Sequence, residues 1–404
     1  MKIPVLKIKK FIQKFFIKKY NDYSKYSIED YFKACIKTDS ILSDFEYKLD
    51  ILACHLLSPI RADLYKKNLY AFRHDLPFKN FFWKQIIRLN FLIIISLFQI
   101  YKACKNLILK KNDQLNKISN QKTLIISHAD KPYQLYSDSD IYYGKRSCHN
   151  ADFCILNKTD EKFNHKNLSK YFSQTNHIFT IETRNINLFL ITKIYIRMLV
   201  NSLKILFYYL RAPFQRDRIS LFVESFSNET FLNFFISSQL KKILDKNFYE
   251  SVITTWEGYP WERILAQYCN KRKIKIFGYI HAGPFPSQYA AYRKMPDIFY
   301  PSQFLTPTEI SKKLLKKYFN YESVVVGSHK FYSNFFNFGT RLSNNLTKES
   351  RKKILLLPQG TFKEVKDICQ LAFLMNFDQF EIILRLHPAL INHKKINKLI
   401  KNLK

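Results

Sequence analysis

The stretch from Ser251 to Pro286 has a strand–helix–strand pattern that restricts the fold of the surrounding chain. Val252 to Thr255 is a short β-prone run, and Trp261 to Lys273 has the spacing of an amphipathic helix. Ile274 to Ile280 follows as a second run typical of a buried strand. Two parallel strands joined by a helix form a βαβ unit, which indicates an α/β fold with a parallel sheet.

Polar residues follow both strands of this unit. Glu257 comes directly after the first strand and His281 directly after the second. In open parallel sheets the ligand crevice lies outside the carboxyl ends of the strands. We therefore expect Glu257 and His281 to lie on the same rim of the sheet, which makes this rim the candidate active site.

Predicted strands and helices also alternate along most of the rest of the chain after residue 118. In the first half, further strands are predicted at 123–127, 153–156, 178–181 and 219–223, with a helix over about 229–244. After Pro296 a second series is predicted, with strands at 298–300, 323–326, 353–357 and 380–386 and helices over about 308–319 and 363–375. The expected organisation is a helical, basic N-terminal region (1–118), a Rossmann-like domain (119–295) and a second Rossmann-like domain (296–404).

The chain is strongly basic, with 66 Lys and Arg against 32 Asp and Glu and a formal charge of +34. Such a charge favours polyanionic partners, namely nucleic acid, anionic lipid headgroups or phosphorylated substrates. A lysine-rich genome would also raise the lysine content throughout. Seven cysteines without a CxxC pair are typical of a reduced, cytoplasmic protein without a cysteine metal site.

Three segments combine apolar residues with a row of basic side chains at helical spacing: 1–20, 81–109 and 186–211. In the last of these, Lys193, Arg197, Lys204 and Arg211 fall within about 40° on a helix. Basic amphipathic helices of this kind suit an anionic membrane surface. Ordinary core helices with lysine on the solvent face explain the pattern about equally well. The sequence has neither a signal peptide nor an apolar run long enough to span a bilayer.

The motif Trp256-Glu257-Gly258, followed far downstream by His387-Pro388, resembles the paired motifs of bacterial GT-B glycosyltransferases. That family includes sialyltransferases, Kdo-type transferases and other surface-polysaccharide and capsule enzymes. The resemblance covers residues 120–390 loosely and is specific in 254–283 and 353–388. It implies a GT-B fold and an inverting transfer of sugar from a nucleotide-activated donor to a capsule- or lipopolysaccharide-type acceptor.

The resemblance also implies roles for individual residues. Glu257 would be the general base that takes the proton of the acceptor hydroxyl. His387 would contact the donor phosphate as it leaves, and Arg385 would add positive charge there. The further positions implied in substrate or donor binding are Gly258, His281, Gly283, Gln359, Gly360 and Thr361. The resemblance implies no metal. It implies no cofactor either, because the donor sugar nucleotide is itself a substrate.

The sequence departs from the family pattern at two places. Trp256 occupies the first acidic position of the acidic–Gly motif. The chain also ends at Lys404, shortly after His387-Pro388, so the donor domain is expected to be incomplete.

Three functions remain open. The first is a glycosyltransferase at the cytoplasmic face of the plasma membrane, with a lipid-linked or growing glycan as acceptor and anionic lipid as partner. The second is a non-catalytic descendant that keeps the fold. The third is a nucleic-acid binder, which is disfavoured because the chain has no RRM, KH or zinc-finger signature. Nucleic acid is therefore not an expected partner.

Overall fold

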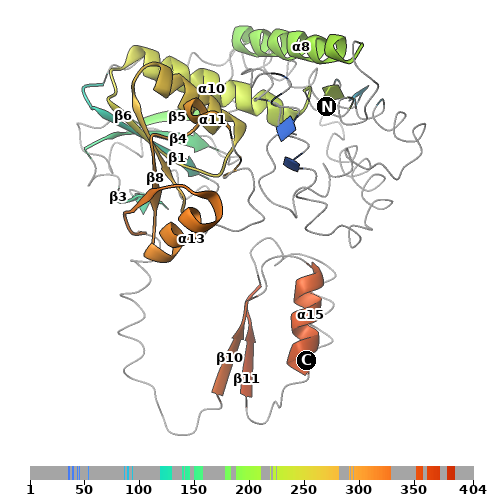
Figure 1. Cartoon of the computed structure of the whole chain (residues 1–404), viewed down its shortest axis with the longest axis vertical. Coiled ribbons are helices and arrows are strands. Elements are labelled where there is room, and N and C mark those ends of the chain that lie inside the picture. Colours follow the sequence, from blue (N-terminus) through green and yellow to red (C-terminus); the bar gives the residue numbers. More distant parts are fainter. Residues whose placement is uncertain are drawn as a thin grey trace, which may run out of the picture. The chain divides into compact units, whose positions relative to one another are not determined.

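The structure is a computed structural model of the whole chain (Figure 1). It describes residues 119–129, 139–140, 142–145, 150–157, 178–182, 188–210, 219, 222–223, 225–281, 291, 293, 295–328, 352–357, 362–373 and 380–386, with isolated positions between 35 and 93. The chain divides into two compact units, Met1–Lys330 and Phe331–Lys404, and each is described by itself.

The first unit contains a seven-stranded sheet in which every pair of neighbouring strands is parallel. Its order is β5-β4-β1-β6-β7-β8-β9. The strands are β1 (Thr123–Ala129), β4 (Asp152–Asn157), β5 (Ile178–Glu182), β6 (Ser251–Thr255), β7 (Lys275–Tyr279), β8 (Gln303–Thr306) and β9 (Ser323–Val325). The chain thus starts in the middle of the sheet, builds outward on one side, and then returns to build the other side. This is the order of a doubly wound Rossmann-like sheet with one added strand, and it confirms the predicted α/β class.

The two central strands are buried along almost their whole length. In β1 every residue from Leu124 to Ala129 is buried, and all six residues of β4 are buried as well. Strands covered on both faces are expected to be continuously apolar. Leu124 and Ile126 belong to the main core, whereas Ile125 packs with Phe153 in a second cluster on the other face.

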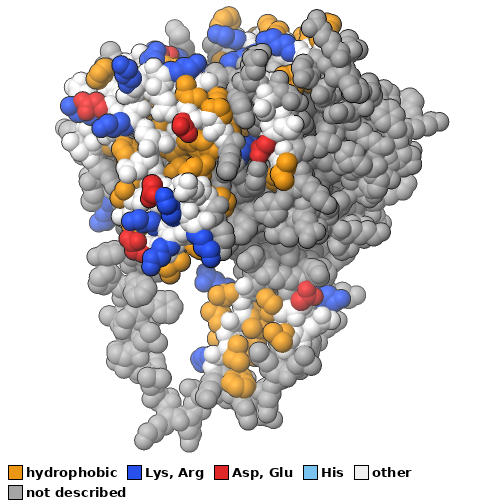
Figure 2. Space-filling model, in the orientation of Figure 1, with side chains coloured by type: hydrophobic (Ala, Val, Ile, Leu, Met, Phe, Trp, Pro, Cys, Tyr) orange, Lys and Arg blue, Asp and Glu red, His pale blue; other side chains and the backbone are white. Residues whose placement is uncertain are grey.

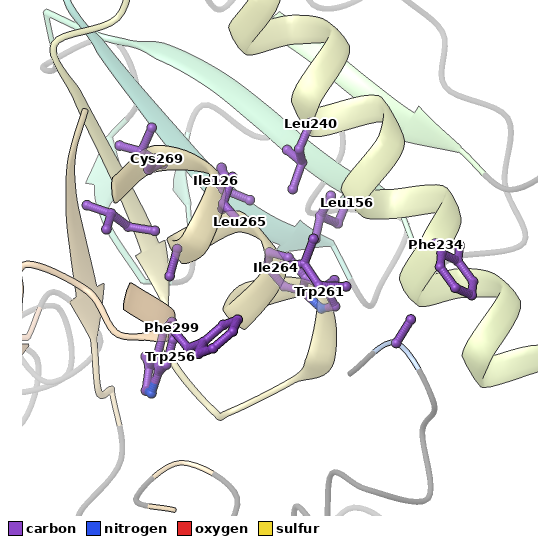
Figure 3. Packing of buried hydrophobic residues seen from close by; sticks show 14 of the residues in the cluster. Ile126, Leu156, Phe234, Leu240, Trp256, Trp261, Ile264, Leu265, Cys269 and Phe299 are labelled. Atoms are coloured by element: carbon purple, nitrogen blue, oxygen red, sulfur yellow. The ribbon is translucent and has the colours of Figure 1, made fainter. Parts of the chain in front are cut away.

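Two of the helices that contribute to the main core lie side by side. They are α10 (Asn228–Lys246) and α11 (Pro260–Lys271), which contact each other, and α11 also contacts β7. Figure 3 shows Leu240 of α10 and Ile264 and Leu265 of α11 gathered with Ile126 and Leu156 of the sheet. Burial of these side chains is the main contribution to stability, about 1.5–3 kcal/mol for each large aliphatic residue.

Local sequence signals account for the helix ends. Ser227 caps α10 by accepting a hydrogen bond from Thr230 N at 3.1 Å. Thr308 caps α13 (Glu309–Phe319) in the same way, through Ser311 N at 3.1 Å. Hydroxyl side chains at this position satisfy an amide that the helix itself cannot pair. At its other end, α13 stops at Asn320, whose φ of 55° is the left-handed conformation typical of a helix terminus.

The apolar segment predicted as a helix over 186–211 forms α8 (Leu188–Leu210), which packs against α10. Within the described part of the chain, no helix is both long enough and apolar enough to cross a bilayer. The helical region predicted over 1–118 lies almost entirely outside the described residues. Two of its described residues contact later parts of the same unit: Ala53 O accepts from Asn233 Nδ2 at 3.0 Å, and Asp39 pairs with Arg293 at 2.6 Å.

The domain boundary predicted at 295/296 is wrong. The strands β8 and β9 pair with β7 and with each other, so they extend the first sheet instead of starting a second one. The predicted strand at 298–300 is a 3-10 turn, η6 (Asp297–Phe299). The pairing with β7 begins only after Pro301, because proline has no N–H to donate; Ser302 N makes the first bond, to Ile276 O at 2.7 Å.

The strand predicted at 219–223 is also wrong. Its described residues Ile219, Phe222 and Val223 are helical. A short apolar run without clear alternation fits a buried strand and a buried helical segment equally well.

The second unit contains a βαβ arrangement. It is built from β10 (Lys352–Leu356), α15 (Phe362–Phe373) and β11 (Phe380–Leu384), and the two strands pair in parallel with Leu356 opposite Leu384. These three elements lie within about two residues of the predicted ranges. The α/β character of this region is therefore confirmed. The second compact unit begins at Phe331, however, and not at residue 296.

Candidate functional site

The strand order indicates where a ligand would bind. In a doubly wound sheet the crevice opens at the carboxyl ends of the two central strands from which the chain leaves in opposite directions. Here those strands are β1 and β6, which pair with Ile126 opposite Thr254. His128 and Ala129 end β1, and Glu257 follows β6. The predicted rim therefore lies at this switch point.

Glu257 and His281 lie side by side, as predicted. The distance from Glu257 Oε1 to His281 Nε2 is 3.6 Å, and both side chains are partly exposed, at 27% and 19%. Their proximity follows from the sheet, because β6 and β7 pair with Thr255 opposite Tyr279. The last ladder bond, from Trp256 N to Tyr279 O at 2.9 Å, holds the two strand ends together just before the pair.

A small hairpin forms one wall of the site. It consists of β2 (Ser139–Asp140) and β3 (Gly144–Lys145), which pair antiparallel. Asp140 fixes the hairpin by accepting hydrogen bonds from the backbone of Tyr142 at 2.8 Å and of Tyr143 at 3.2 Å. Its other oxygen accepts from the hydroxyl of Ser127 in β1.

The hairpin brings an aromatic side chain to the Glu257–His281 pair. The rings of Tyr142 and His281 lie 4.7 Å apart, centre to centre, with a tilt of 57°. Beside it, the ring of Tyr143 lies 5.9 Å from that of Tyr279 at the end of β7. Burial, followed by the charge of Asp140, raises the pKa of Tyr143 well above its usual value, so this phenol is neutral and not a proton acceptor. The side chains that this wall places against His281 and Tyr279 are thus aromatic.

A second carboxyl group lies beneath Glu257. Glu262 is fully buried, and its Oε2 accepts three backbone N–H bonds, from Glu257 at 3.0 Å, Gly258 at 2.7 Å and Tyr259 at 2.9 Å. The φ of 82° at Gly258 is the left-handed conformation that allows the chain to turn around this oxygen. Burial, and then repulsion from Glu257, raises the pKa of Glu262 to about 8, although the three N–H bonds act in the opposite direction.

Glu262 decides between two interpretations of Glu257. A carboxylate just before a helix could simply interact with the unpaired amides at the helix N-terminus. In α11 that structural role belongs to Glu262, the third helical residue, whose carboxylate accepts hydrogen bonds from the three unpaired amides before the helix. Glu257 is therefore not needed as a cap, and its side chain lies against His281 instead. Gly258 is one of the positions expected in substrate or donor binding, and its backbone N–H donates to Glu262.

The floor of the site is a buried aromatic layer. Trp256 is 1% exposed and donates its indole N–H to Ala291 O at 3.2 Å. The guanidinium of Arg263 lies near the rings of both Trp256 and Tyr300, at 5.4 Å and 5.1 Å from their centres. Tryptophan at the first position of the acidic–Gly motif thus packs in the core, where a carboxylate would be buried. On the β1 side, His128 makes an edge contact with Trp261 at 5.7 Å.

Of the other predicted site residues, the structure describes only Arg385. Gly283, Gln359, Gly360, Thr361 and His387 lie outside the described residues. Arg385 is exposed in the second unit, directly after β11, and its backbone N–H donates to Leu356 O at 3.0 Å. The pairing of Glu257 with His387 and Arg385 stays a prediction. Among the residues that the structure describes, no group of three His, Cys, Asp or Glu side chains is placed to hold a metal ion.

Sequence reasoning missed Glu262, Asp140 and Tyr142. Glu262 has a recognisable signal, because an acidic residue at the third helical position after a proline start is typical of a helix N-terminus. Asp140 has a weaker one, since Asp two residues before a turn ending in Gly144 favours a tight turn. Tyr142 has none, because its contact with His281 depends on tertiary folding.

No protein-family model and no curated sequence matches the chain. Two solved structures are similar in outline. UDP-GlcNAc 2-epimerase from Neisseria meningitidis, bound to UDP-GlcNAc, is 14% identical over 70% of this chain and 71% of that one, with a TM-score of 0.37. UDP-N-acetylglucosamine 2-epimerase from Rickettsia bellii is 14% identical over 69% and 67%, with a TM-score of 0.31. The fold assignment above depends on sheet order and register, not on these likenesses.

Proposed function

We propose that the protein is an inverting, metal-independent glycosyltransferase. It would move a sugar from a nucleotide-activated donor to a surface glycan of the capsule or lipopolysaccharide type. The observation that carries the proposal is the Glu257–His281 pair at the switch point of a doubly wound sheet. A partly exposed carboxylate beside an imidazole, at the edge where such sheets bind ligands, is suited to proton transfer.

In the proposed reaction Glu257 is the general base. The acceptor hydroxyl oxygen forms a bond to the anomeric carbon while the bond from that carbon to the donor phosphate breaks. The hydroxyl proton passes to Glu257, and the electron pair of the broken bond leaves with the nucleotide. A single displacement of this kind inverts the anomeric centre. His387 and Arg385 are proposed to stabilise the leaving phosphate.

His281 has a defined place in this scheme. Its Nε2 lies 3.6 Å from Glu257 Oε1, so the imidazole is placed to orient the carboxylate toward the acceptor hydroxyl. The ring of Tyr142 packs against the imidazole in a tilted contact. The same contact allows the reverse assignment, in which His281 takes the proton and Glu257 orients it.

Two substitutions separate these assignments. With Glu257 as base, Glu257→Gln lowers kcat by about 100-fold or more, because general-base catalysis contributes about that much, while nucleotide affinity stays the same. His281→Gln then has the smaller effect on kcat. The reverse order of the two effects would assign the base to His281. Glu309→Gln, an exposed carboxyl in α13, is the matched control.

The assay begins with a thermal-shift screen against CMP-, UDP-, GDP- and dTDP-sugars, CDP-glycerol and free nucleotides. A donor that raises Tm is then tested for release of its nucleotide in the presence of glycan acceptors. Stabilisation by one nucleotide class supports the proposal. Absence of any shift and any turnover across the panel would favour the non-catalytic homologue.

The proposed acceptor is a lipid-linked or growing glycan, and the proposed location is the inner face of the plasma membrane. A charge of +34 supports an anionic lipid surface as partner. Nucleic acid is not proposed as a partner. Binding of mixed-sequence RNA more tightly than of anionic vesicles at equal salt would contradict this part of the proposal.

A further inference from the structure

The helix α8 has two different apolar faces. One is packed in the core and contains Ile191, Ile194, Met198 and Ile205. It is held to α10 by side-chain contacts: the rings of Tyr195 and Phe231 stack at 5.2 Å, and the Arg197 guanidinium lies 4.9 Å from the ring of Phe234. The second face is exposed. Its apolar side chains are Phe189, Ile196, Leu199, Val200, Leu203, Leu206 and Phe207.

The exposed apolar residues form one continuous strip. In a projection at about 100° per residue they occupy an arc of about 120° that runs the length of the helix. Lys193, Arg197 and Lys204 occupy the adjoining sector of about 40°. The sequence of α8 contains no Asp or Glu. Figure 2 shows hydrophobic and Lys or Arg side chains alternating along the upper edge, where Figure 1 places α8.

A strip of this size is unusual for a water-facing helix. Single exposed apolar residues are normal, but a contiguous apolar patch bordered by polar residues marks an interaction site. Phe189 and Phe207, at opposite ends of the helix, are 76% and 62% exposed. A binding partner for this patch must contact the row of apolar side chains and must also carry negative charge opposite the basic side chains beside that row.

We propose that α8 lies in the surface of an anionic lipid bilayer, with its exposed apolar strip among the acyl chains and Lys193 and Lys204 at the headgroups. Charge decides for lipid against a second copy of the chain, because two copies of +34 repel each other, whereas anionic headgroups attract them. Spanning is not an option for α8, since one face is fixed in the core and the described helices do not meet the requirement for a span.

The test is co-flotation of the full chain with vesicles of phosphatidylcholine alone or mixed with phosphatidylglycerol. The wild-type chain is expected to float with the mixed vesicles. The variant carrying Phe189→Gln, Ile196→Gln and Phe207→Gln is expected to lose about 100-fold or more in partition coefficient, because three buried apolar side chains are lost. A matched control replaces exposed apolar residues elsewhere, Phe248→Gln with Ile310→Gln, and should float like the wild type.

The basic flank is tested separately. Lys193→Gln with Lys204→Gln is expected to lower the partition coefficient about 30-fold, at about 1 kcal/mol for each lysine near an anionic surface. Lys271→Gln with Lys313→Gln, both exposed outside α8, serves as the control. This arm depends on charge alone, so it remains informative if the apolar triple variant has an altered Tm.

Two outcomes would overturn the inference. One is undiminished flotation of both α8 variants, which would place lipid binding elsewhere on the chain. The other is a change from dimer to monomer in light scattering of the triple variant with flotation unchanged, which would make a second copy the occupant. The inference deepens the proposed membrane location, and flotation requires no donor, so it can be tested even if the proposed transfer reaction is wrong.

Discussion

Replacing Glu262 by glutamine tests the most unusual electrostatic feature of the site. The pKa of this carboxyl is raised from its ordinary 4.5 to about 8 by burial and by the charge of Glu257. At pH values between 4.5 and about 8, Glu262 has lost its proton in the unfolded chain but keeps it in the folded chain. The free energy of unfolding therefore falls as the pH rises through this range. The linkage relation gives a loss of about 3 kcal/mol between pH 5 and pH 7.5. Glutamine is neutral in both states and keeps an oxygen for the three amides.

The measurement is the free energy of unfolding in urea, followed by tryptophan fluorescence, at pH 5 and pH 7.5. The contributions of other titrating groups cancel when the variant is compared with the wild type at the same pH. We expect the free energy of unfolding of the variant, relative to that of the wild type, to increase by about 3 kcal/mol from pH 5 to pH 7.5. Glu309→Gln, at an exposed helix start, should stay within about 0.5 kcal/mol of the wild type at both values. A pH-independent difference for Glu262→Gln would refute the raised pKa. A difference of the opposite sign would mean that the three amides hold the carboxyl ionised.

Two further substitutions test individual contacts within the first unit. Gly278→Ala should lower the free energy of unfolding by about 1–3 kcal/mol, because its Cβ would lie 2.8 Å from Pro301 Cγ and 3.2 Å from Trp256 Cβ. An unchanged Tm would mean that Pro301 moves aside without cost. Tyr249→Phe should cost about 1–3 kcal/mol, since the Tyr249 hydroxyl donates to the buried Asp152 carboxylate at 2.7 Å. A urea midpoint equal to that of the wild type would show that Asp152 does not depend on this bond.

The pairing of Glu257 with His281 could be predicted because it needs only local information. Each residue follows a strand that the sequence marks clearly, and a single helix joins the two strands. A right-handed crossover of this length places the second strand parallel to the first, usually as its neighbour. The carboxyl ends then meet at one edge, which brings the two side chains together.

Sheet membership could not be predicted in the same way. The strands β8 and β9 have the same length and composition as strands that would begin a new domain, and only their pairing with β7 assigns them to the first sheet. Spacing along the chain does not determine which edge a short strand joins. The contact of Tyr142 with His281 has the same origin, since it depends on how Asp140 and Ser127 hold the hairpin against β1.

The pairing of β1 with β6 also has a consequence for how the molecule forms. The hydroxyls of Thr123 and Ser251 meet across this pair at 2.9 Å although they are 128 positions apart. Closing such a loop costs about 1.5 kcal/mol more than closing the loop between β6 and β7. Strands β6 to β9 are therefore expected to assemble first. The other side of the sheet, formed by β1, β4 and β5, is expected to join them late. The sheet edge where β1 meets β6 beside Glu257 is then one of the last features to form, so a chain that has completed only half of its sheet holds Glu257 but lacks the β1 side of the candidate site.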